Sequence, residues 1–240
     1  MIIIPARLHS TRLPHKLLLP LGGIPIVIRT ANIAKEIDST IVASDSKEIL
    51  DICKKYNIDC VLTSKEHTSG TDRCAEVAKK LKLDNDEVVI NLQGDEPFIE
   101  SNIIENLKQS MKNAIFNKSA FMASCYKEID SAYADDSNIV KVILDSNSNA
   151  LYFSRSKIPY NRDNAEVSYF GHIGIYAFSA KSLNEFCNFS KSQIEDIEKL
   201  EQLRALWYGK KILMIKVKTD SIGIDTKNDY ENALKLIGDK

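Results

Sequence analysis

Runs of apolar residues alternate with segments of helical periodicity along the first half of the chain. The apolar runs predict strands at 2–4, 41–43, 60–62 and 88–92, and the segments after them predict helices at 25–36, 46–56, 71–83 and 101–111. Strands that are apolar at almost every position are typical of a mainly parallel sheet covered by helices on both faces. Ligands of such sheets bind beyond the carboxyl ends of the strands, so the residues after each strand are the first candidates for chemistry.

The pattern changes after residue 120. Strands are predicted at 121–126, 140–144, 150–153 and 172–178 with few helices between them, and the polar stretch 145–149 predicts a hairpin turn. Two helices at 181–189 and 195–208, a strand at 212–217 and a helix at 227–237 follow. We therefore expect one α/β nucleotide-binding domain over 1–240, with an antiparallel excursion at about 125–180.

Composition narrows the possible partners. Lys and Arg number 32 against 33 Asp and Glu, a net charge of −1, and there is no basic run, so nucleic acid and membranes are not expected partners. The five cysteines are widely spaced without a C-x-x-C pair, which favours a reducing cytoplasm. The apolar stretch 17–28 contains two prolines and two glycines, so we do not expect a secretory signal, and it is too short to span a bilayer.

The loop predicted after the first strand carries clustered cations. Arg7, Arg12 and Lys16 lie there with the hydroxyls of Ser10 and Thr11 between them. Cations, hydroxyls and free backbone amides at a strand end suit a polyphosphate. The chain contains neither a Walker A loop nor a G-x-G-x-x-G fingerprint. A solvated basic loop explains the charges equally well.

A second candidate is the stretch 67–73, in which a Ser-Gly-Thr turn leads into a predicted helix. The backbone amides and dipole of that helix favour an anion, and Thr71 can cap it. Arg73 in the first turn is unfavourable unless an anion lies nearby. The alternative is an ordinary capped helix with a surface arginine, and we interpret His67 as a structural histidine.

Two carboxylates at strand ends suggest a metal. Asp95, beside Glu96, follows the strand at 88–92, and Asp225 follows the strand at 212–217. Mg²⁺ prefers one or two carboxylates completed by water and phosphate oxygens. An acidic turn explains the first position, and an N-cap formed by Asp225 or Thr226 explains the second, so both alternatives stay open.

Polar residues also interrupt apolar stretches later in the chain. His172 and Tyr176 are four apart, which places them on one face of a strand, either lining a pocket or packing in the core. Glu201 and Arg204 have the spacing of an ion pair on the surface of a helix.

Taken together, motifs along nearly the whole chain resemble those of one family, the 3-deoxy-manno-octulosonate (Kdo) cytidylyltransferases, or CMP-Kdo synthetases. Each motif is modest alone, but their occurrence in order is highly specific. They are I-P-A-R-x-x-S-T-R-L-P-x-K at 4–16, H-x-S-G-T-D-R at 67–73, N-L-Q-G-D-E-P at 91–97, A-L-Y-F-S-R at 150–155, H-I-G-I-Y at 172–176, E-x-L-E-Q-L-R-x-L-W-Y-G at 198–209 and G-I-D-T at 223–226.

The resemblance implies a cytoplasmic, Mg²⁺-dependent enzyme that converts CTP and Kdo into CMP-Kdo and diphosphate for lipopolysaccharide biosynthesis. It also implies a Rossmann-like nucleotide-diphospho-sugar transferase fold with a small antiparallel dimerisation lobe, and a homodimer. By the same resemblance, Arg7 and Lys16 would hold the triphosphate, and Ser69, Gly70 and Arg73 would bind the nucleotide. Asp95 and Asp225 would bind Mg²⁺, and Gln93, Arg155, His172, Tyr176, Glu201 and Gln202 would surround the sugar acid.

Position 15 departs from the family, which often has glycine there, whereas this chain has His15. A positive φ is costly for histidine, so the loop either does not need one or differs locally. A related cytidylyltransferase acting on amino-Kdo or sialic acid is the nearest alternative, although sialic-acid enzymes usually carry Gly-Gly where this chain has Leu8 and His9. A silent nucleotide-binding regulator is a third possibility, against which the intact Lys16, Asp95 and Asp225 argue, because a sensor would not need metal-binding carboxylates.

Overall fold

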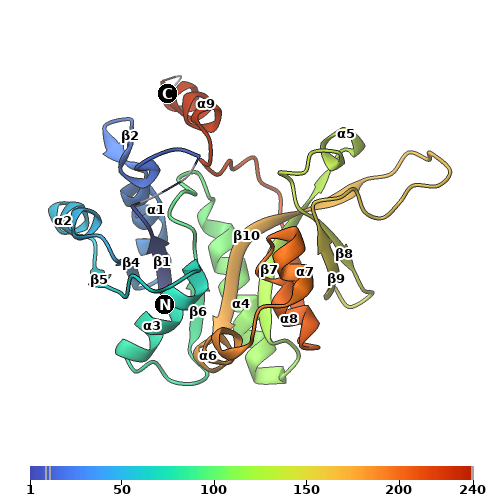
Figure 1. Ribbon diagram of the computed structural model, residues 1–240, viewed down its shortest axis with the longest axis horizontal. Helices are drawn as coiled ribbons and strands as arrows, with labels where there is room; N and C mark the ends of the chain where they lie inside the picture. Colours follow the sequence, from blue (N-terminus) through green and yellow to red (C-terminus); the bar gives the residue numbers. More distant parts are fainter. Residues whose placement is uncertain (9, 11, 239–240) are drawn as a thin grey trace. The chain divides into compact units, whose positions relative to one another are not determined.

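The computed structural model describes residues 1–8, 10 and 12–238 (Figure 1). Contacts within the chain group it into two compact units. The first joins Met1–Glu105 to the residues from Thr219 onward, and the second is Asn106–Lys218. The chain therefore leaves the first unit and later returns to it. In the described part of the chain, no helix has the length and apolar character needed to cross a membrane.

The first unit is built on a parallel sheet with strand order β6-β1-β4-β5. β1 is buried along its whole length, because helices cover both faces of the sheet. In register, Ile2 pairs with Thr40 on one side and Ile90 on the other. The strands are β1 (Ile2–Ala6), β4 (Thr40–Ser44), β5 (Cys60–Leu62) and β6 (Val88–Asn91), with a hairpin of β2 (Pro20–Leu21) and β3 (Ile24–Pro25) beside them. The helices are η1 (Lys16–Leu18), α1 (Ile26–Lys35), α2 (Lys47–Lys55), α3 (Gly70–Lys80), α9 (Lys227–Gly238) and the start of α4 (Ser101–Asn117).

The order of these strands fixes where a ligand can bind. The chain runs outward from β1 through α1, β4 and α2 to β5, and α3 then carries it back past β1 to β6. Right-handed crossovers place α1 and α2 on one face of the sheet and α3 on the other. The direction reverses between β1 and β6, so the loops after these two strands flank the switch point at which such sheets bind ligands.

The second unit is mainly antiparallel. β7 pairs antiparallel with β10 and parallel with β11, and β8 and β9 form the predicted hairpin, which joins β10 at one position. Its strands are β7 (Met122–Ile129), β8 (Lys141–Leu144), β9 (Ala150–Ser154), β10 (Tyr169–Ser179) and β11 (Ile212–Lys216). Its helices are α5 (Ser131–Ala134), α6 (Ala180–Asn188), α7 (Gln193–Glu198), α8 (Leu203–Trp207) and the end of α4.

β10 contains an irregularity that preserves its faces. Ile173 pairs with Cys125 and Tyr176 with Ser124, so three steps along β10 match one step along β7. The two extra residues are an even number, and side chains before and after them therefore keep their sides. The rings of His172 and Tyr176 lie 5.5 Å apart, which confirms that they share a face.

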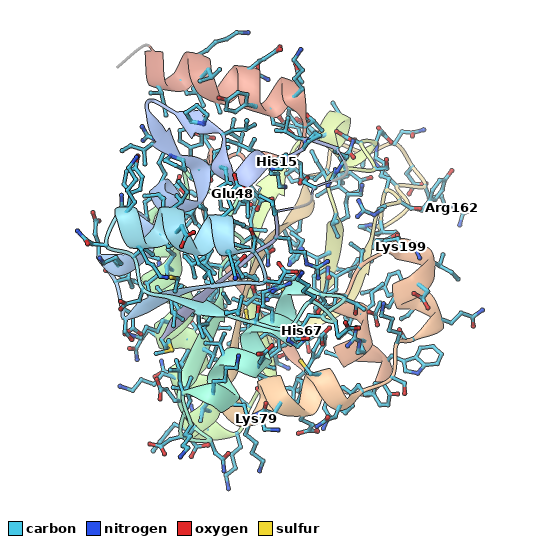
Figure 2. The ribbon with its side chains drawn as sticks, turned by 60° about the vertical axis from the view of Figure 1, so that its left-hand side comes forward. His15, Glu48, His67, Lys79, Arg162 and Lys199 are labelled. Carbon is cyan, nitrogen blue, oxygen red and sulfur yellow. The ribbon has the colours of Figure 1, made fainter. Side chains whose placement is uncertain are left out.

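Two local predictions were wrong, one on a helix length and one on a cap. The helix predicted at 195–208 is two helices, because Lys199 (labelled in Figure 2) adopts a left-handed conformation with φ 53° and ends α7. Ser69, rather than Thr71, caps α3: its hydroxyl accepts from the amide of Asp72, whose carboxylate accepts from the amide of Ser69. Ser46 is at the N-cap position of α2, but its side chain makes no capping hydrogen bond.

Candidate active site

Lys16 lies between two carboxylates at the carboxyl end of the first unit's sheet. Its ammonium donates to Oδ1 of Asp225 at 2.7 Å and also to Oδ2 of Asp95. Nη2 of Arg12 lies 2.9 Å from the other oxygen of Asp225. The Lys16 side chain is 12% exposed and that of Asp225 is 48% exposed, so the cluster opens to solvent on one side. The structure thus brings together the predicted phosphate-binding lysine and both predicted metal ligands.

The hydrogen bonds at the start of α9 show whether Asp225 caps this helix or is left for the site. The hydroxyl of Thr226 accepts from the amide of Asp229 at 3.2 Å, and the Asp229 carboxylate accepts from the amides of Asp225 and Thr226. Thr226 and Asp229 therefore cap the helix reciprocally. The Asp225 carboxylate is left to Lys16 and Arg12, so it is not the cap.

Burial and neighbouring charges shift the pKa values of Lys16, Asp225 and Glu96. Burial acts to lower the pKa of Lys16, but Asp95 and Asp225 outweigh it and hold that pKa above its ordinary value. Burial acts to raise the pKa of Asp225, but Lys16 and Arg12 outweigh it, so that pKa is lowered. Glu96 behaves differently, because burial together with the charges of Asp95 and Asp225 raises the pKa of Glu96 to about 8. Burial therefore favours the protonated form of Glu96, whereas Lys16 and Asp225 are held in their charged forms.

Gly223 allows the irregular segment between β11 and α9 to pass close to Glu96. A Cβ atom at this position would lie 2.8 Å from Oε1 of Glu96, closer than real contacts allow. The missing side chain lets the segment that carries Asp225 run beside the acidic turn.

His15, where the family often has glycine, adopts the left-handed backbone conformation that glycine favours. Its φ is +54° and its ψ 22°, so the loop does need a left-handed residue immediately before Lys16, and histidine adopts it (Figure 2). That conformation costs a non-glycine residue on the order of 1–2 kcal/mol. Lys16 begins the short helix η1 directly after it, so the backbone turn at His15 sets where the ammonium points.

The N-terminus of α3 lies against the end of β1. A Cβ atom on Gly70 would lie 3.0 Å from the Pro5 ring and 3.8 Å from Nε2 of Gln93. Gln93 in turn donates to Oδ1 of Asn91 at 3.0 Å. The Ser69 amide is taken by the Asp72 carboxylate, so it is Gly70 that brings the helix start next to Gln93, an arrangement that suits an anion or a nucleotide.

Arg73 lies beneath this helix start and is 1% exposed. Its guanidinium donates to the Thr63 hydroxyl and, at 3.4 Å, to the Ser64 carbonyl, and it lies 3.4 Å from Asp45. The anion that the sequence required beside this arginine is thus Asp45, at the end of β4. Direct contact of Arg73 with a nucleotide stays a prediction.

His67 (Figure 2) anchors the segment that leads into α3. Its Nε2 contacts the carboxylate of Glu76, which also accepts from the Ser64 amide at 2.9 Å and pairs with Lys80 at 2.5 Å. Burial acts to raise the pKa of Glu76, but these partners lower it to about 2. The structural interpretation of His67 agrees with this geometry.

Arg7 is exposed at the beginning of the loop after β1. Residues 9 and 11 of the same loop, including the Thr11 hydroxyl that the sequence singled out, lie outside the described residues.

In the second unit, the hydrogen bonds of Ser124 determine which ring nitrogen of His172 carries the proton. The Ser124 hydroxyl lies 2.8 Å from both His172 Nε2 and the Ile175 carbonyl. A hydroxyl has one proton, and the carbonyl can only accept, so we assign the proton on Nε2 to histidine, which donates to Ser124. Burial lowers the pKa of His172 to about 3, which keeps the ring neutral. Nδ1 is then an acceptor, to which the described residues offer no hydrogen bond.

Tyr176, whose ring lies beside that of His172, is hydrogen-bonded to Gln202. The Tyr176 hydroxyl donates to Oε1 of Gln202 at 3.2 Å, and burial followed by the charge of Glu201 raises the pKa of Tyr176. Gln202 is 3% exposed, and its Nε2 has no hydrogen-bond partner among the described residues. Such a buried amide is unfavourable unless something supplies an acceptor.

The predicted Glu201–Arg204 ion pair is present, but it does not lie on the surface as expected, because Arg204 is 4% exposed. Arg204 is buried and binds Glu195 through two hydrogen bonds of 2.8 and 2.6 Å, whereas Glu201 lies 3.7 Å from it. The break at Lys199 folds α7 back so that Glu195 meets Arg204.

Arg155 is held entirely by backbone carbonyls. Nε donates to the Glu198 carbonyl and Nη1 to the Ser137 carbonyl, each at 2.9 Å. The Glu198 carboxylate accepts from the Arg155 amide at 2.9 Å and from Ser154 Oγ at 2.5 Å. Among the described residues no carboxylate forms an ion pair with this guanidinium, and Nη2 has no hydrogen bond. Its charge and one arm of its fork are available to an anion.

The sequence assigned no site role to Glu96, Ser124 or Glu198, and it placed Arg12 in the cation loop without its partner Asp225. Glu96 belongs to the motif at 91–97, so its position was visible but its contacts were not. Ser124 and Glu198 act through partners far away along the chain, which no local pattern signals.

Comparison with known proteins gives this geometry a family. The cytidylyltransferase family model matches residues 1–212. The 3-deoxy-manno-octulosonate cytidylyltransferase of Wolinella succinogenes is 54% identical over 243 residues, covering 100% of both chains. That of Helicobacter pylori strain HPAG1 is 52% identical over 240 residues, covering 98% of this chain and 97% of the relative.

Solved structures agree. That of CMP:2-keto-3-deoxy-manno-octonic acid synthetase complexed with CTP has a TM-score of 0.92 and 34% identity, covering 99% of this chain and 98% of that chain. The 4-diphosphocytidyl-2C-methyl-D-erythritol synthase of Anaerococcus prevotii, at 16% identity and a TM-score of 0.61, covers 99% of this chain and 97% of its own and shares the fold alone. The predicted α/β nucleotide-diphospho-sugar transferase fold is thereby confirmed. The chain belongs to the cytidylyltransferase family and, within it, to the 3-deoxy-manno-octulosonate cytidylyltransferases.

Proposed function

We propose that this chain transfers the cytidylyl group of CTP to the anomeric hydroxyl of Kdo and releases diphosphate. The observation that carries the proposal is the meeting of Lys16 with Asp95 and Asp225 at the strand ends of the first unit. This arrangement offers a cation to phosphate oxygens and a carboxylate pair to a divalent metal. The relatives named above supply the identity of the two substrates.

The residues of the first unit are proposed to hold CTP. Lys16, with Arg7 at the other end of the loop, would bind the triphosphate, and the start of α3 at Ser69 and Gly70 would bind the nucleotide. Arg73 would shape the strand ends beneath that helix, given its contacts with Thr63 and Asp45.

Asp95 and Asp225 fit the requirements of Mg²⁺. Both offer hard carboxylate oxygens, and the contact that each makes with the Lys16 ammonium places them next to each other. Mg²⁺ bound by these two residues would offset the charge of the triphosphate and of the departing diphosphate. Lys16 would then exchange its carboxylate partners for phosphate oxygens.

The residues of the second unit are proposed for the sugar acid. The free arm of Arg155 suits a carboxylate, and Nε2 of Gln202 requires an acceptor that a sugar hydroxyl or carboxylate can supply. Neutral His172 offers Nδ1 to a hydroxyl proton, with Tyr176 beside it. Gln93 and Glu201 complete the proposed set.

The proposed chemistry is an in-line displacement at the α-phosphorus of CTP. A bond forms between the anomeric oxygen of Kdo and that phosphorus, the bond from phosphorus to the diphosphate oxygen breaks, and the hydroxyl proton is released. The two substrates are both anions, so repulsion opposes their encounter. The cations Lys16, Arg7 and Arg155 would offset it, and catalysis would consist mainly of positioning and charge neutralisation.

We further propose that the enzyme works in the cytoplasm, as a homodimer, in the activation of Kdo for lipopolysaccharide. The five cysteines are all free thiols, which favours a reducing compartment. Leu151 and Tyr160 of the second unit are 59% and 87% exposed, and we propose these two side chains as contacts with a second copy. Sedimentation of the wild type against Tyr160→Lys tests the dimer.

A matrix of the four nucleoside triphosphates against Kdo, amino-Kdo and sialic acid, scored as diphosphate release, tests the function. We expect release with CTP and Kdo together and not with either alone. Faster release with amino-Kdo or sialic acid would establish a related cytidylyltransferase. No release with any pair, despite CTP binding, would establish a silent nucleotide-binding regulator.

A further inference from the structure

Lys141 is a fully buried lysine that no part of the proposed mechanism uses. It begins β8, pairs in register with Ser154 of β9, and is 0% exposed. Its ammonium donates to the backbone carbonyls of Asp136 at 2.9 Å, Ile139 at 2.6 Å and Arg155 at 2.5 Å. An ammonium has three protons, so its hydrogen-bonding capacity is filled.

The charge of the Lys141 ammonium is not needed to fill the space that its side chain occupies. A methionine would fill nearly the same volume, and burying an ammonium is unfavourable unless every proton is accepted. What the ammonium does is draw together three carbonyl oxygens that otherwise repel one another. Two come from the segment that enters β8, and the third comes from the residue that follows β9. Lys141 thus closes the open end of the β8–β9 hairpin around a single cation.

Lys141 is connected to Arg155 in two ways. Lys141 binds the Arg155 main chain directly, and it binds the 136–139 segment whose Ser137 carbonyl accepts from Nη1 of Arg155. Arg155 therefore depends on Lys141 for the position of its backbone and for one of the two carbonyls that orient its guanidinium. A planar fork recognises a carboxylate only if its plane is held in place.

We propose that Lys141 is a positioning residue for sugar-acid recognition, fixing the Arg155 guanidinium in the orientation that binds the substrate carboxylate. The inference rests on the proposed role of Arg155 in binding Kdo. Lys141 itself does not reach substrate, because it is completely buried with all its protons accepted.

The test is Lys141→Met in the full-length enzyme, with KM for Kdo and the Kd for CTP measured separately. We expect KM for Kdo to rise at least ~10-fold, while the Kd for CTP stays within about twofold, on the scale of a lost orienting contact. Lys157→Met is the matched control. Lys157 lies two residues from Arg155, but its ammonium binds the exposed Asp135 carboxylate at 2.9 Å, so its loss should leave both constants unchanged.

Arg155→Lys and the double variant show whether a failed prediction concerns the role of Arg155 or only that of Lys141. If Lys141 acts through Arg155, adding Lys141→Met to Arg155→Lys should raise KM for Kdo little beyond the single variants. A normal KM for Kdo in Arg155→Lys would overturn the assignment of Arg155 and the inference with it. A raised KM there but a normal one in Lys141→Met would overturn the inference alone.

Lys141→Gln guards against a variant that does not fold. Glutamine can donate two of the three hydrogen bonds, so KM for Kdo should lie between those of the wild type and Lys141→Met. A loss of thermal stability with equal effects on both substrates, in either variant, would reduce Lys141 to a structural residue and overturn the proposal.

Discussion

Oδ1 of Asp225 accepts a hydrogen bond of 2.7 Å from the Lys16 ammonium, although 209 positions separate the two residues. Lys16 belongs to the loop after β1, and Asp225 comes just before the capped start of α9. Each partner satisfies the other's charge, and under the proposed function Lys16 would exchange its carboxylate partners for phosphate oxygens.

Lys16→Met should lower kcat/KM for CTP at least ~100-fold, the scale of removing a preorganised charge from a reacting phosphate. The variant leaves Asp95 and Asp225 facing each other without their cation. Mg²⁺ should therefore raise the melting temperature of this variant more than that of the wild type. Diphosphate release and thermal melting with and without Mg²⁺ measure both effects, and near-normal turnover would contradict the assigned role.

Asp95→Asn and Asp225→Asn should each keep a near-native melting temperature, lose most turnover and require more Mg²⁺ for the rest. Asparagine keeps the size of aspartate but is a weaker ligand of a hard cation. The double variant should be little worse than the worse single one, because residues that act as a unit are not additive.

Thr226→Ala is the control for these variants. It removes the cap of α9 and should cost about 1 kcal/mol of stability without a catalytic defect. If Asp225→Asn behaved like Thr226→Ala, Asp225 would be a structural residue and Asp95 would remain the only proposed protein ligand.

Substitutions at His15 should rank by their tolerance of positive φ. His15→Gly keeps the left-handed turn and should retain most activity, whereas His15→Val disfavours it strongly and should lower kcat/KM for CTP about tenfold or more. The physical reason is that the turn aims Lys16, so the defect should appear in CTP binding and not in KM for Kdo. Equal activity in the glycine and valine variants would contradict this reading of the loop.

His172 should contribute to the acid sensitivity of the fold. Its pKa is lowered by burial to about 3, below the ordinary value of 6.5, so between these values the unfolded chain binds the extra proton and stability falls as pH falls. In His172→Gln, which retains hydrogen-bonding groups but does not titrate, this contribution is absent. The melting temperature of the wild type relative to the variant should thus be higher at pH 7.5 than at pH 5. A constant difference would show that the ring is solvated enough to keep its ordinary pKa.

The sequence predicted the strands of the first unit well, because buried parallel strands are continuous apolar runs. It failed at 195–208, where helical periodicity continues through Lys199 although the backbone there turns left-handed without glycine or proline to mark it. The β2–β3 hairpin was also missed, since each of its strands has only two residues and contains a proline.

The candidate site was predicted as a set of residues but not as a set of contacts. Asp225 and Thr226 fit a cap equally well by pattern, and only the hydrogen bonds of Asp229 separate them. Arg73 carried a signal of a nearby anion, but its partner Asp45 lies just after β4, far from the motif at 67–73. Lys141 gave no signal, because a lysine at the start of a strand is ordinarily a solvated residue.

The return of the chain to its first unit has a consequence for synthesis on the ribosome. Residues up to 105 supply Lys16 and Asp95, but Asp225 is added 120 positions later (225 − 105), after the whole second unit. At roughly 5–20 residues per second, this interval lasts about 6–24 s. During it the nascent chain holds an acidic turn and a lysine without the second carboxylate, so a prematurely terminated polypeptide can fold its first strands yet never assemble the pair. Under the proposed role of Asp225, activity would require translation of the segment that follows the second unit.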